Sequence, residues 1–141
     1  MSKKITAMIL SVFLALSLFV VPAYAAEFNS GTASPAYEIG LNPTSDLTIS
    51  GTTVTCFSRI ISQSNVKITA EQTLEKYWGL WFWTSVDGAS WTKTVNSNSI
   101  TMSNTKSGLA NGKYRLKTVF TLTNSSGKSE TITVYSSEKK I

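Results

Sequence analysis

The chain has 141 residues, a formal net charge of +5, one cysteine and no histidine. The lack of histidine excludes Ser-His-Asp and Cys-His catalysis and most zinc sites. A single cysteine cannot form an intramolecular disulfide. The basic excess is too small and too dispersed to indicate nucleic-acid binding. A chain of this length is expected to form one domain that buries a core without disulfides or metals.

The first residues have the pattern of a secretory signal peptide, which we assign to residues 1–25. A lysine pair precedes an apolar run over residues 5–21, and Pro22 ends this run just before an Ala-Tyr-Ala cleavage pattern. Cleavage after Ala25 would lower the formal charge to +3, because it removes both lysines. The alternative is an uncleaved membrane anchor, since the run is close to the shortest that spans a bilayer. We expect a secreted, extracellular protein that can associate with the cell envelope.

A leading arm and one β domain are expected after the signal peptide. Residues 26–45 are rich in Ser, Gly, Pro and Asn without periodicity, which is typical of a flexible arm. In the domain, residues 46–141, apolar and polar side chains alternate as in half-buried antiparallel strands. The pattern predicts about seven short strands, drawn from eight candidate segments at residues 47–50, 53–61, 66–75, 80–85, 90–95, 100–102, 114–122 and 131–135. Turns are predicted at 62–65, 96–98 and 124–127.

The alternation also predicts which side chains face the core. The inward sets are Val54, Cys56, Ser58 and Ile60; Val66, Ile68, Ala70, Gln72 and Leu74; Tyr114, Leu116, Thr118, Phe120 and Leu122; Ile132 and Val134. Leu109 is the one apolar side chain in the polar connection before the penultimate strand, and it is expected to plug the core.

Residues 77–91 include all four tryptophans, and the sequence is compatible with two hairpin registers in this segment. In the first, the turn is Val86–Ala89, and Trp83 lies opposite Trp91. In the second, the turn is Tyr77–Leu80, and Asp87-Gly88 belongs to a wide loop. We favour the first, because Asp-Gly between β-prone residues is a stronger turn signal than a lone glycine.

The pattern of strands predicts an all-β, antiparallel two-sheet sandwich, and several positions favour an immunoglobulin-like one. Cys56 lies mid-strand, as the first core cysteine of such domains does. The approach to Tyr114 is similar to a tyrosine corner, in which the hydroxyl bonds back to the preceding backbone. Leu116 stands where the second cysteine is expected, so the sandwich would lack the disulfide.

The C-terminal part resembles a recurrent signature of small secreted proteins of Gram-positive bacteria, mostly Firmicutes, grouped as domains of unknown function. The resemblance runs from Tyr114-Arg115-Leu116-Lys117 through Gly127-Lys128-Ser129-Glu130-Thr131 to Tyr135-Ser136-Ser137. The signal peptide and residues 46–51 fit the same pattern. It implies a β-sandwich and export, and it transfers no catalytic or binding residue.

The residues that could carry chemistry do not form a site, so we expect no enzyme, metal or cofactor. Cys56 is predicted to point inward, where a thiol is inert. Glu71 and Glu75 lie roughly 13 Å apart along a strand, which exceeds the separation of glycosidase carboxylate pairs. Asp87 has no further oxygen ligands at calcium-loop spacing. Its role in a turn is sufficient to account for it.

The aromatic stretch remains as the candidate binding site, because both of its faces are apolar. Strand alternation directs Tyr77, Trp81 and Trp83 to one face and Trp78, Leu80 and Phe82 to the other. A sandwich strand has one core face, so part of this set should reach the surface unless the arm or a second copy covers it. The candidate patch consists of Trp78, Leu80, Trp81, Phe82, Trp83 and Trp91.

Exposed flat rings stack on sugars or penetrate a lipid interface. We therefore expect a non-catalytic protein that binds cell-wall glycan or another component of the cell envelope through a Trp-rich hairpin. One alternative is a secreted antimicrobial or membrane-active protein, which the basic charge favours. The other is a structural or accessory protein that self-associates.

Overall fold

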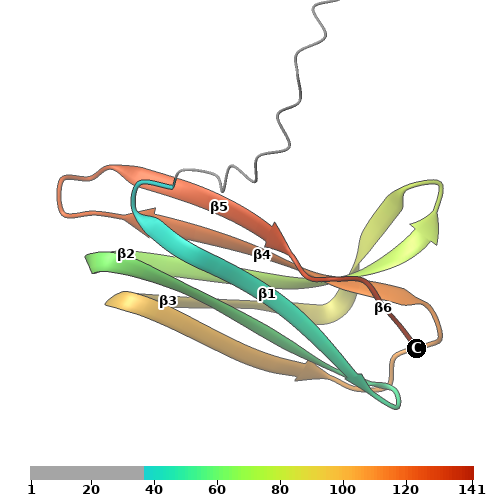
Figure 1. The fold of residues 1–141 in the computed structure, drawn as a ribbon. Helices are drawn as coiled ribbons and strands as arrows, with labels where there is room; N and C mark the ends of the chain where they lie inside the picture. The colour runs from blue at the N-terminus through green and yellow to red at the C-terminus, as the bar shows by residue number, and fades with distance from the viewer. Residues whose placement is uncertain (1–36) are drawn as a thin grey trace, which may run out of the picture. The chain divides into compact units, whose positions relative to one another are not determined.

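A computed structural model of the chain describes residues 37–141, which form an antiparallel all-β domain (Figure 1). Its strands are β1 (Gly40–Ser50), β2 (Thr53–Gly79), β3 (Phe82–Lys106), β4 (Lys113–Thr123), β5 (Ser129–Tyr135) and β6 (Lys139–Lys140). The expected signal peptide, its cleavage after Ala25 and residues 26–36 of the expected arm lie outside the described residues. Within residues 37–141 no helix is long and apolar enough to cross a bilayer.

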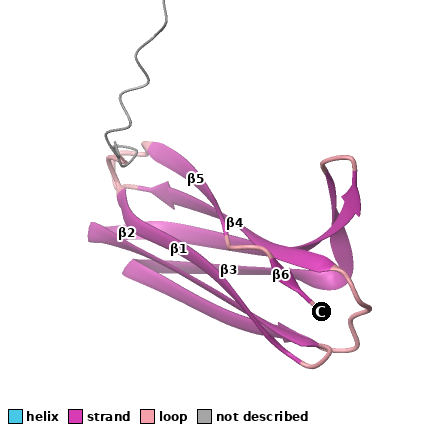
Figure 2. Cartoon of the chain, turned by 45° about the vertical axis from the view of Figure 1, so that its right-hand side comes forward, coloured by secondary structure: helices cyan, strands magenta, loops and turns pink. Residues whose placement is uncertain are grey.

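The two long strands β2 and β3 organise the sheet. They pair with each other along almost their whole length of 27 and 25 residues. The other edge of β2 pairs with β1 through residues 53–62 and with β4 through residues 67–76. Both long strands bend between these two regions, so the half that carries β1 curls over the half that carries β4 and β5 (Figures 1 and 2). The result is one continuous sheet, curled like a half-barrel.

The turns predicted at residues 62–65 and 96–98 are wrong, because both segments lie inside continuous strands. At the bend, Ile61 pairs with Ser99 and Val66 pairs with Ser97, so β2 carries extra residues opposite β3. Such an irregularity changes the direction of a strand while the hydrogen-bonded ladder continues on both sides. The sequence pattern therefore predicts two shorter strands in place of each long strand, with a turn where the structure has a bend.

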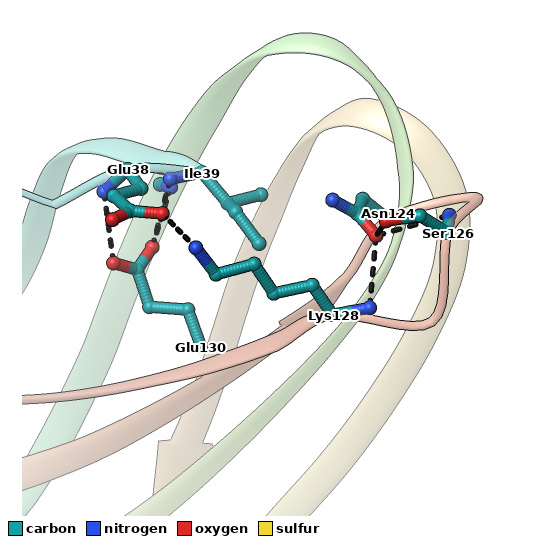
Figure 3. A network of polar contacts seen from close by, with 7 residues as sticks. Glu38, Ile39, Asn124, Ser126, Lys128 and Glu130 are labelled. Atoms are coloured by element: carbon teal, nitrogen blue, oxygen red, sulfur yellow. Dashed lines mark hydrogen bonds and ion pairs between the residues drawn. The ribbon is translucent and has the colours of Figure 1, made fainter.

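The sheet begins at Gly40, earlier than the boundary expected at Asp46, so residues 40–45 belong to β1 and not to an arm. The Glu130 carboxylate fixes the start of this strand by accepting hydrogen bonds from three backbone N–H groups, those of Glu38 at 2.9 Å, Ile39 at 3.0 Å and Gly40 at 2.9 Å (Figure 3). Lys128 also forms an ion pair with the Glu38 carboxylate.

Gly40 itself packs closely against the core. A Cβ placed on it would lie 2.7 Å from Ile132 Cδ1 and 2.8 Å from Ile60 Cδ1, so a larger residue would collide with two buried side chains. The neighbouring β4–β5 turn is closed by Asn124, whose side-chain oxygen accepts from the N–H of Ser126 at 3.1 Å and of Lys128 at 2.9 Å (Figure 3). This confirms the turn predicted at 124–127.

The predicted core faces are confirmed for the three longest inward sets. Every member of the sets at 54–60, 66–74 and 114–122 is buried, and Leu109 is buried as the expected plug. The core has two clusters, one around Ile60, Ile68 and Phe120 and one around Leu74 and Leu116. A period of two predicts these faces well, because it depends only on the local backbone.

A chain of polar side chains crosses this core and joins the two halves of the sheet. Thr118 Oγ1 lies 2.7 Å from Ser58 Oγ and 2.9 Å from Ser45 Oγ. Gln72 donates to Ser58 Oγ at 2.7 Å and accepts from Asn104 at 2.7 Å. Among the described residues no buried side-chain polar atom lacks a partner. A satisfied buried network of this kind favours one alignment of the two halves over others.

Two further expectations about the fold are met. The domain is all-β and antiparallel, and its single cysteine excludes an intramolecular disulfide. The Tyr114 hydroxyl donates a hydrogen bond of 2.6 Å to the carbonyl oxygen of Ala110, which confirms the predicted return contact.

Candidate functional site: an exposed aromatic hairpin tip

The end of β2 and the start of β3 form a hairpin that projects from the rest of the sheet (Figures 1 and 2). Tyr77 pairs with Trp83 and Gly79 pairs with Phe82, so the chain reverses through two residues, Leu80 and Trp81. The register that we favoured from the sequence, with the turn at Val86–Ala89, is wrong. The second register, with the turn at Tyr77–Leu80, comes closer, but Tyr77 is still paired with Trp83 and the turn itself lies at Leu80 and Trp81.

The Asp87-Gly88 segment forms a wide bulge inside β3. Thr73 pairs with Ser90 and Glu75 pairs with Ser85, so four residues of β3, 86–89, lie opposite Leu74 alone. Ala89 is fully buried, and the half-buried Val86 packs against the same core cluster. The apolar residues on either side of Asp87-Gly88 thus hold this segment against the domain, which a free hairpin turn would not allow.

The turn residues adopt a costly backbone conformation. Leu80 has φ of 50° and Trp81 has φ of 68°, both in the left-handed region. Two left-handed residues in a two-residue hairpin loop are the pattern of a type I′ turn, which Asn-Gly or Gly-Gly normally occupies. For other residues this conformation costs about 1 to 3 kcal/mol each. The tip therefore carries bulky apolar side chains where small or polar ones would be more stable.

Four side chains at this turn are exposed, and we call them the tip patch. Their exposed fractions are 75% for Trp78, 78% for Leu80, 88% for Trp81 and 66% for Phe82. No residue of the described range covers them. Since the chain reverses at the turn, the predicted alternation of residues 77–83 between two faces does not hold. The chain instead gathers the aromatic side chains at one extremity.

The other two predicted site residues lie elsewhere. Trp83 is half-buried in the stem of the hairpin, 5.2 Å from Tyr77 between ring centroids. Trp91 pairs with Gln72 in the body of the sheet and packs against both core clusters. It also lines an open groove of about 360 Å³ between residues 91–93 and 101–104 of β3. The sequence thus predicts one patch of six residues where the structure brings four of them together.

Arg115 of β4 attaches the stem to the body. Its guanidinium carbon lies 4.2 Å from the ring centroid of Trp83 and 4.3 Å from that of Tyr135. Its Nε donates to Glu75 Oε2 at 2.7 Å, and both side chains of this ion pair are largely buried. The partner of Glu75 thus comes from β4, a strand that is distant from it in sequence.

Five cations lie near the base of the hairpin, and we call them the basic collar. They are Lys76, Lys113, Arg115, Lys139 and Lys140. Lys113 Nζ lies 5.1 Å from the Tyr77 ring centroid, and Lys76 of β2 pairs with Tyr114 of β4. The short strand β6 places its two lysines beside Lys113 and Tyr114.

Two carboxylates offset part of this charge. Glu138 pairs with Lys113 at 2.9 Å, and Glu75 pairs with Arg115. Among the described residues Lys76, Lys139 and Lys140 make no ion pair, so the collar keeps an excess of three positive charges. Sequence reasoning missed the collar, because its members come from β2, β4 and β6 and form no continuous run.

The candidate catalytic and metal-binding residues do not gather. Burial raises the pKa of the Cys56 thiol to about 12, and the thiol is enclosed in the core as predicted. Glu75 is engaged with Arg115, and Glu71 is exposed on the strand. Within residues 37–141 no group of three or more His, Cys, Asp or Glu side chains could hold a metal ion.

No protein-family model matches the sequence. No curated protein matches it either. Among solved structures the chain is similar to wild-type OgpA from Akkermansia muciniphila in two crystal forms, with 13% and 15% identity and TM-scores of 0.40 and 0.39. These matches cover 74% and 70% of this chain and 31% and 29% of OgpA.

Catalytically inactive OgpA in complex with an O-glycopeptide substrate, glycodrosocin, is similar at 12% identity and a TM-score of 0.38, over 77% of this chain and 34% of OgpA. The chain thus spans about a third of the length of the solved structures that it matches. Similarity of this degree defines neither a family nor an activity.

Proposed function

We propose that this protein is exported and attaches, without catalysis, to the bacterial cell envelope through the tip patch. The observation that carries the proposal is the pair Leu80 and Trp81 in left-handed conformation at the exposed turn. An unfavourable backbone conformation persists only where the rest of the fold offsets its free-energy cost. Residues in such conformations cluster at functional sites. Asn-Gly would form the same turn without this cost and without an apolar surface.

The stem supports this role because its contacts attach the hairpin to the body of the domain. The Arg115 guanidinium lies between Trp83 and Tyr135, and it is bonded to Glu75. A tip that is already ordered loses less conformational entropy when it binds, so more of its contact energy appears as affinity. Four large apolar side chains on such a support are typical of an interaction site.

Export and the finer fold are also part of this proposal. The signal-peptide pattern and the resemblance to small secreted Firmicutes proteins both support export from the cell. The finer fold, an immunoglobulin-like two-sheet sandwich, is likewise proposed. It is supported by the bond from Tyr114 to Ala110 and by the contacts of Ser45 and Ser58 with Thr118 between the facing halves of the curled sheet.

The test is co-sedimentation of the protein with an envelope fraction that contains both cell wall and membrane. The variant Leu80→Asn/Trp81→Gly should lose binding while it keeps the fold. The matched control is Phe57→Ser, which removes an exposed apolar side chain from β2 in the body of the sheet. Binding that the double substitution leaves intact would refute the proposal. A mass that rises with concentration in light scattering, and falls with the same substitution, would instead assign the tip patch to self-association.

A further inference from the structure

We infer that the envelope component which the tip patch binds is an anionic lipid interface; this inference rests on the proposed attachment through the tip. It commits the site to one partner, a bilayer surface with negatively charged headgroups. Two observations carry it: the composition of the tip itself, and the position of the basic collar behind it.

The tip has the chemistry of a group that enters a lipid interface. Residues 78–82 are Trp-Gly-Leu-Trp-Phe, so the two indole N–H groups are the only side-chain hydrogen-bond donors there, and side-chain acceptors are absent. Tryptophan is favoured at the level of the headgroups, because its ring is apolar and its N–H can stay hydrated. A glycan platform needs fixed polar side chains beside the rings to bind hydroxyl groups, and residues 78–82 supply none.

The collar lies at the depth where lipid phosphates would be met. Lys76 precedes Gly79 by three residues, so about 10 Å of strand separates it from the turn. Apolar groups of interfacial segments enter the boundary between headgroups and acyl chains by about 5 to 10 Å. A tip inserted to that depth would bring Lys76, Lys113 and the β6 lysines to the phosphates.

Charge complementarity distinguishes this partner from a neutral apolar surface. The collar has five cations and two carboxylates, and both β6 lysines are exposed. Each lysine near an anionic membrane surface strengthens binding roughly fivefold at moderate ionic strength, and salt weakens this contribution. Insertion of the tip and attraction by the collar would act together, as interfacial segments combine apolar area with basic charge.

The experiment measures binding to vesicles of phosphatidylcholine alone and to vesicles made of equal parts phosphatidylcholine and phosphatidylglycerol, by sedimentation and by tryptophan emission. We expect binding to the mixed vesicles, with a blue shift of the emission as the indoles leave water. Lys139→Gln/Lys140→Gln should weaken binding on the order of 25-fold. Leu80→Asn/Trp81→Gly should abolish both binding and the shift.

The matched control for charge is Arg59→Gln/Lys67→Gln. It removes two exposed cations of β2 whose strand partners lie far from the hairpin. Arg59 pairs with Thr101, and Lys67 pairs with Asn96 and Thr123. This variant has the same net charge as the β6 double variant, and it should bind nearly as the unaltered protein does. Equal weakening by both pairs would overturn the role of the collar, because bulk charge would then explain the binding.

The outcomes separate the two proposals. Tip-dependent binding to the envelope fraction, or to purified peptidoglycan, without binding to the mixed vesicles would overturn the lipid inference and leave the proposed attachment standing. Equal binding to both vesicle types, insensitive to salt, would overturn the anionic specificity. Binding to the envelope fraction that does not depend on Leu80 and Trp81 would overturn the proposed function itself.

Discussion

The guanidinium carbon of Arg115 lies 4.2 Å from the centroid of the Trp83 ring. The two residues belong to β4 and β3, which do not pair with each other, and this contact fixes the hairpin stem to the body of the sheet. The same guanidinium contacts Tyr135 and bonds to Glu75, so one side chain joins four strands.

Arg115→Lys should therefore lower the free energy of unfolding by about 1 to 2 kcal/mol, because a lysine cannot stack on two rings and bond to a carboxylate at once. Chemical denaturation measures this change. In this variant, amide hydrogen exchange should accelerate in residues 75–85, relative to the unaltered protein, more than it does in β4. The control is Arg59→Lys on the exposed face of β2, for which no change is expected. Unaltered exchange in the hairpin would contradict the role given to Arg115.

Leu80→Asn/Trp81→Gly should raise the stability of the protein while it removes the tip patch. Asparagine and glycine tolerate the left-handed conformation that both residues adopt, so the substitution should recover part of the cost of about 1 to 3 kcal/mol per residue and raise the free energy of unfolding. Thermal and chemical denaturation check this result. An unchanged or lower stability would mean that the turn stores no strain, and the argument from backbone cost would fail.

Glu130→Gln should remove an acid-sensitive part of the stability. Partial burial of the Glu130 carboxyl raises its pKa, but hydrogen bonds from the N–H groups of Gly40, Glu38 and Ile39 and the charge of Lys128 outweigh it, so the pKa is lowered overall. A carboxyl whose pKa is lower in the folded state stabilises the fold above its unfolded pKa. This stabilisation is lost as the pH falls through the folded pKa.

The measurement is the free energy of unfolding of both proteins as a function of pH. The difference between them should be constant at neutral pH, and it should shrink as the pH falls below the ordinary glutamate range. A difference that stays constant through the acid range would show that the carboxylate charge contributes nothing to holding the start of β1.

Cys56 should resist alkylation in the folded protein. Its thiol is fully buried, and burial raises its pKa to about 12, so little thiolate is present at neutral pH and none is accessible. A maleimide or iodoacetamide time course, followed by mass spectrometry, should show labelling only when denaturant is added. The denatured protein is the control for reagent activity. Rapid labelling in buffer would mean that β1 and β2 open readily.

Much of the fold can be predicted from the sequence because it depends on neighbours along the chain. The alternation from Tyr114 to Leu122 predicts a buried face, and the spacing from Ala110 to Tyr114 predicts the hydroxyl bond, since both follow from local backbone geometry. The bends at 62–65 and 96–98 are not predictable in this way. Their polar residues are typical of turns, and only the pairing of β2 with both β1 and β4 keeps the strand continuous.

The candidate site shows the same division. The sequence by itself determined that the aromatic residues are concentrated between 77 and 91, that the cysteine is a core residue, and that histidine chemistry is absent. It favoured the Asp87-Gly88 turn, because turn propensity is a local property. Burial of Ala89 and Val86 against the core outweighed that propensity and moved the turn to Leu80 and Trp81.

Only the tertiary structure decided which aromatic side chains are exposed, and that five cations from three strands lie near the base of the hairpin. Exposure and charge clustering depend on which strands lie side by side, and this arrangement is set by packing between residues distant in sequence.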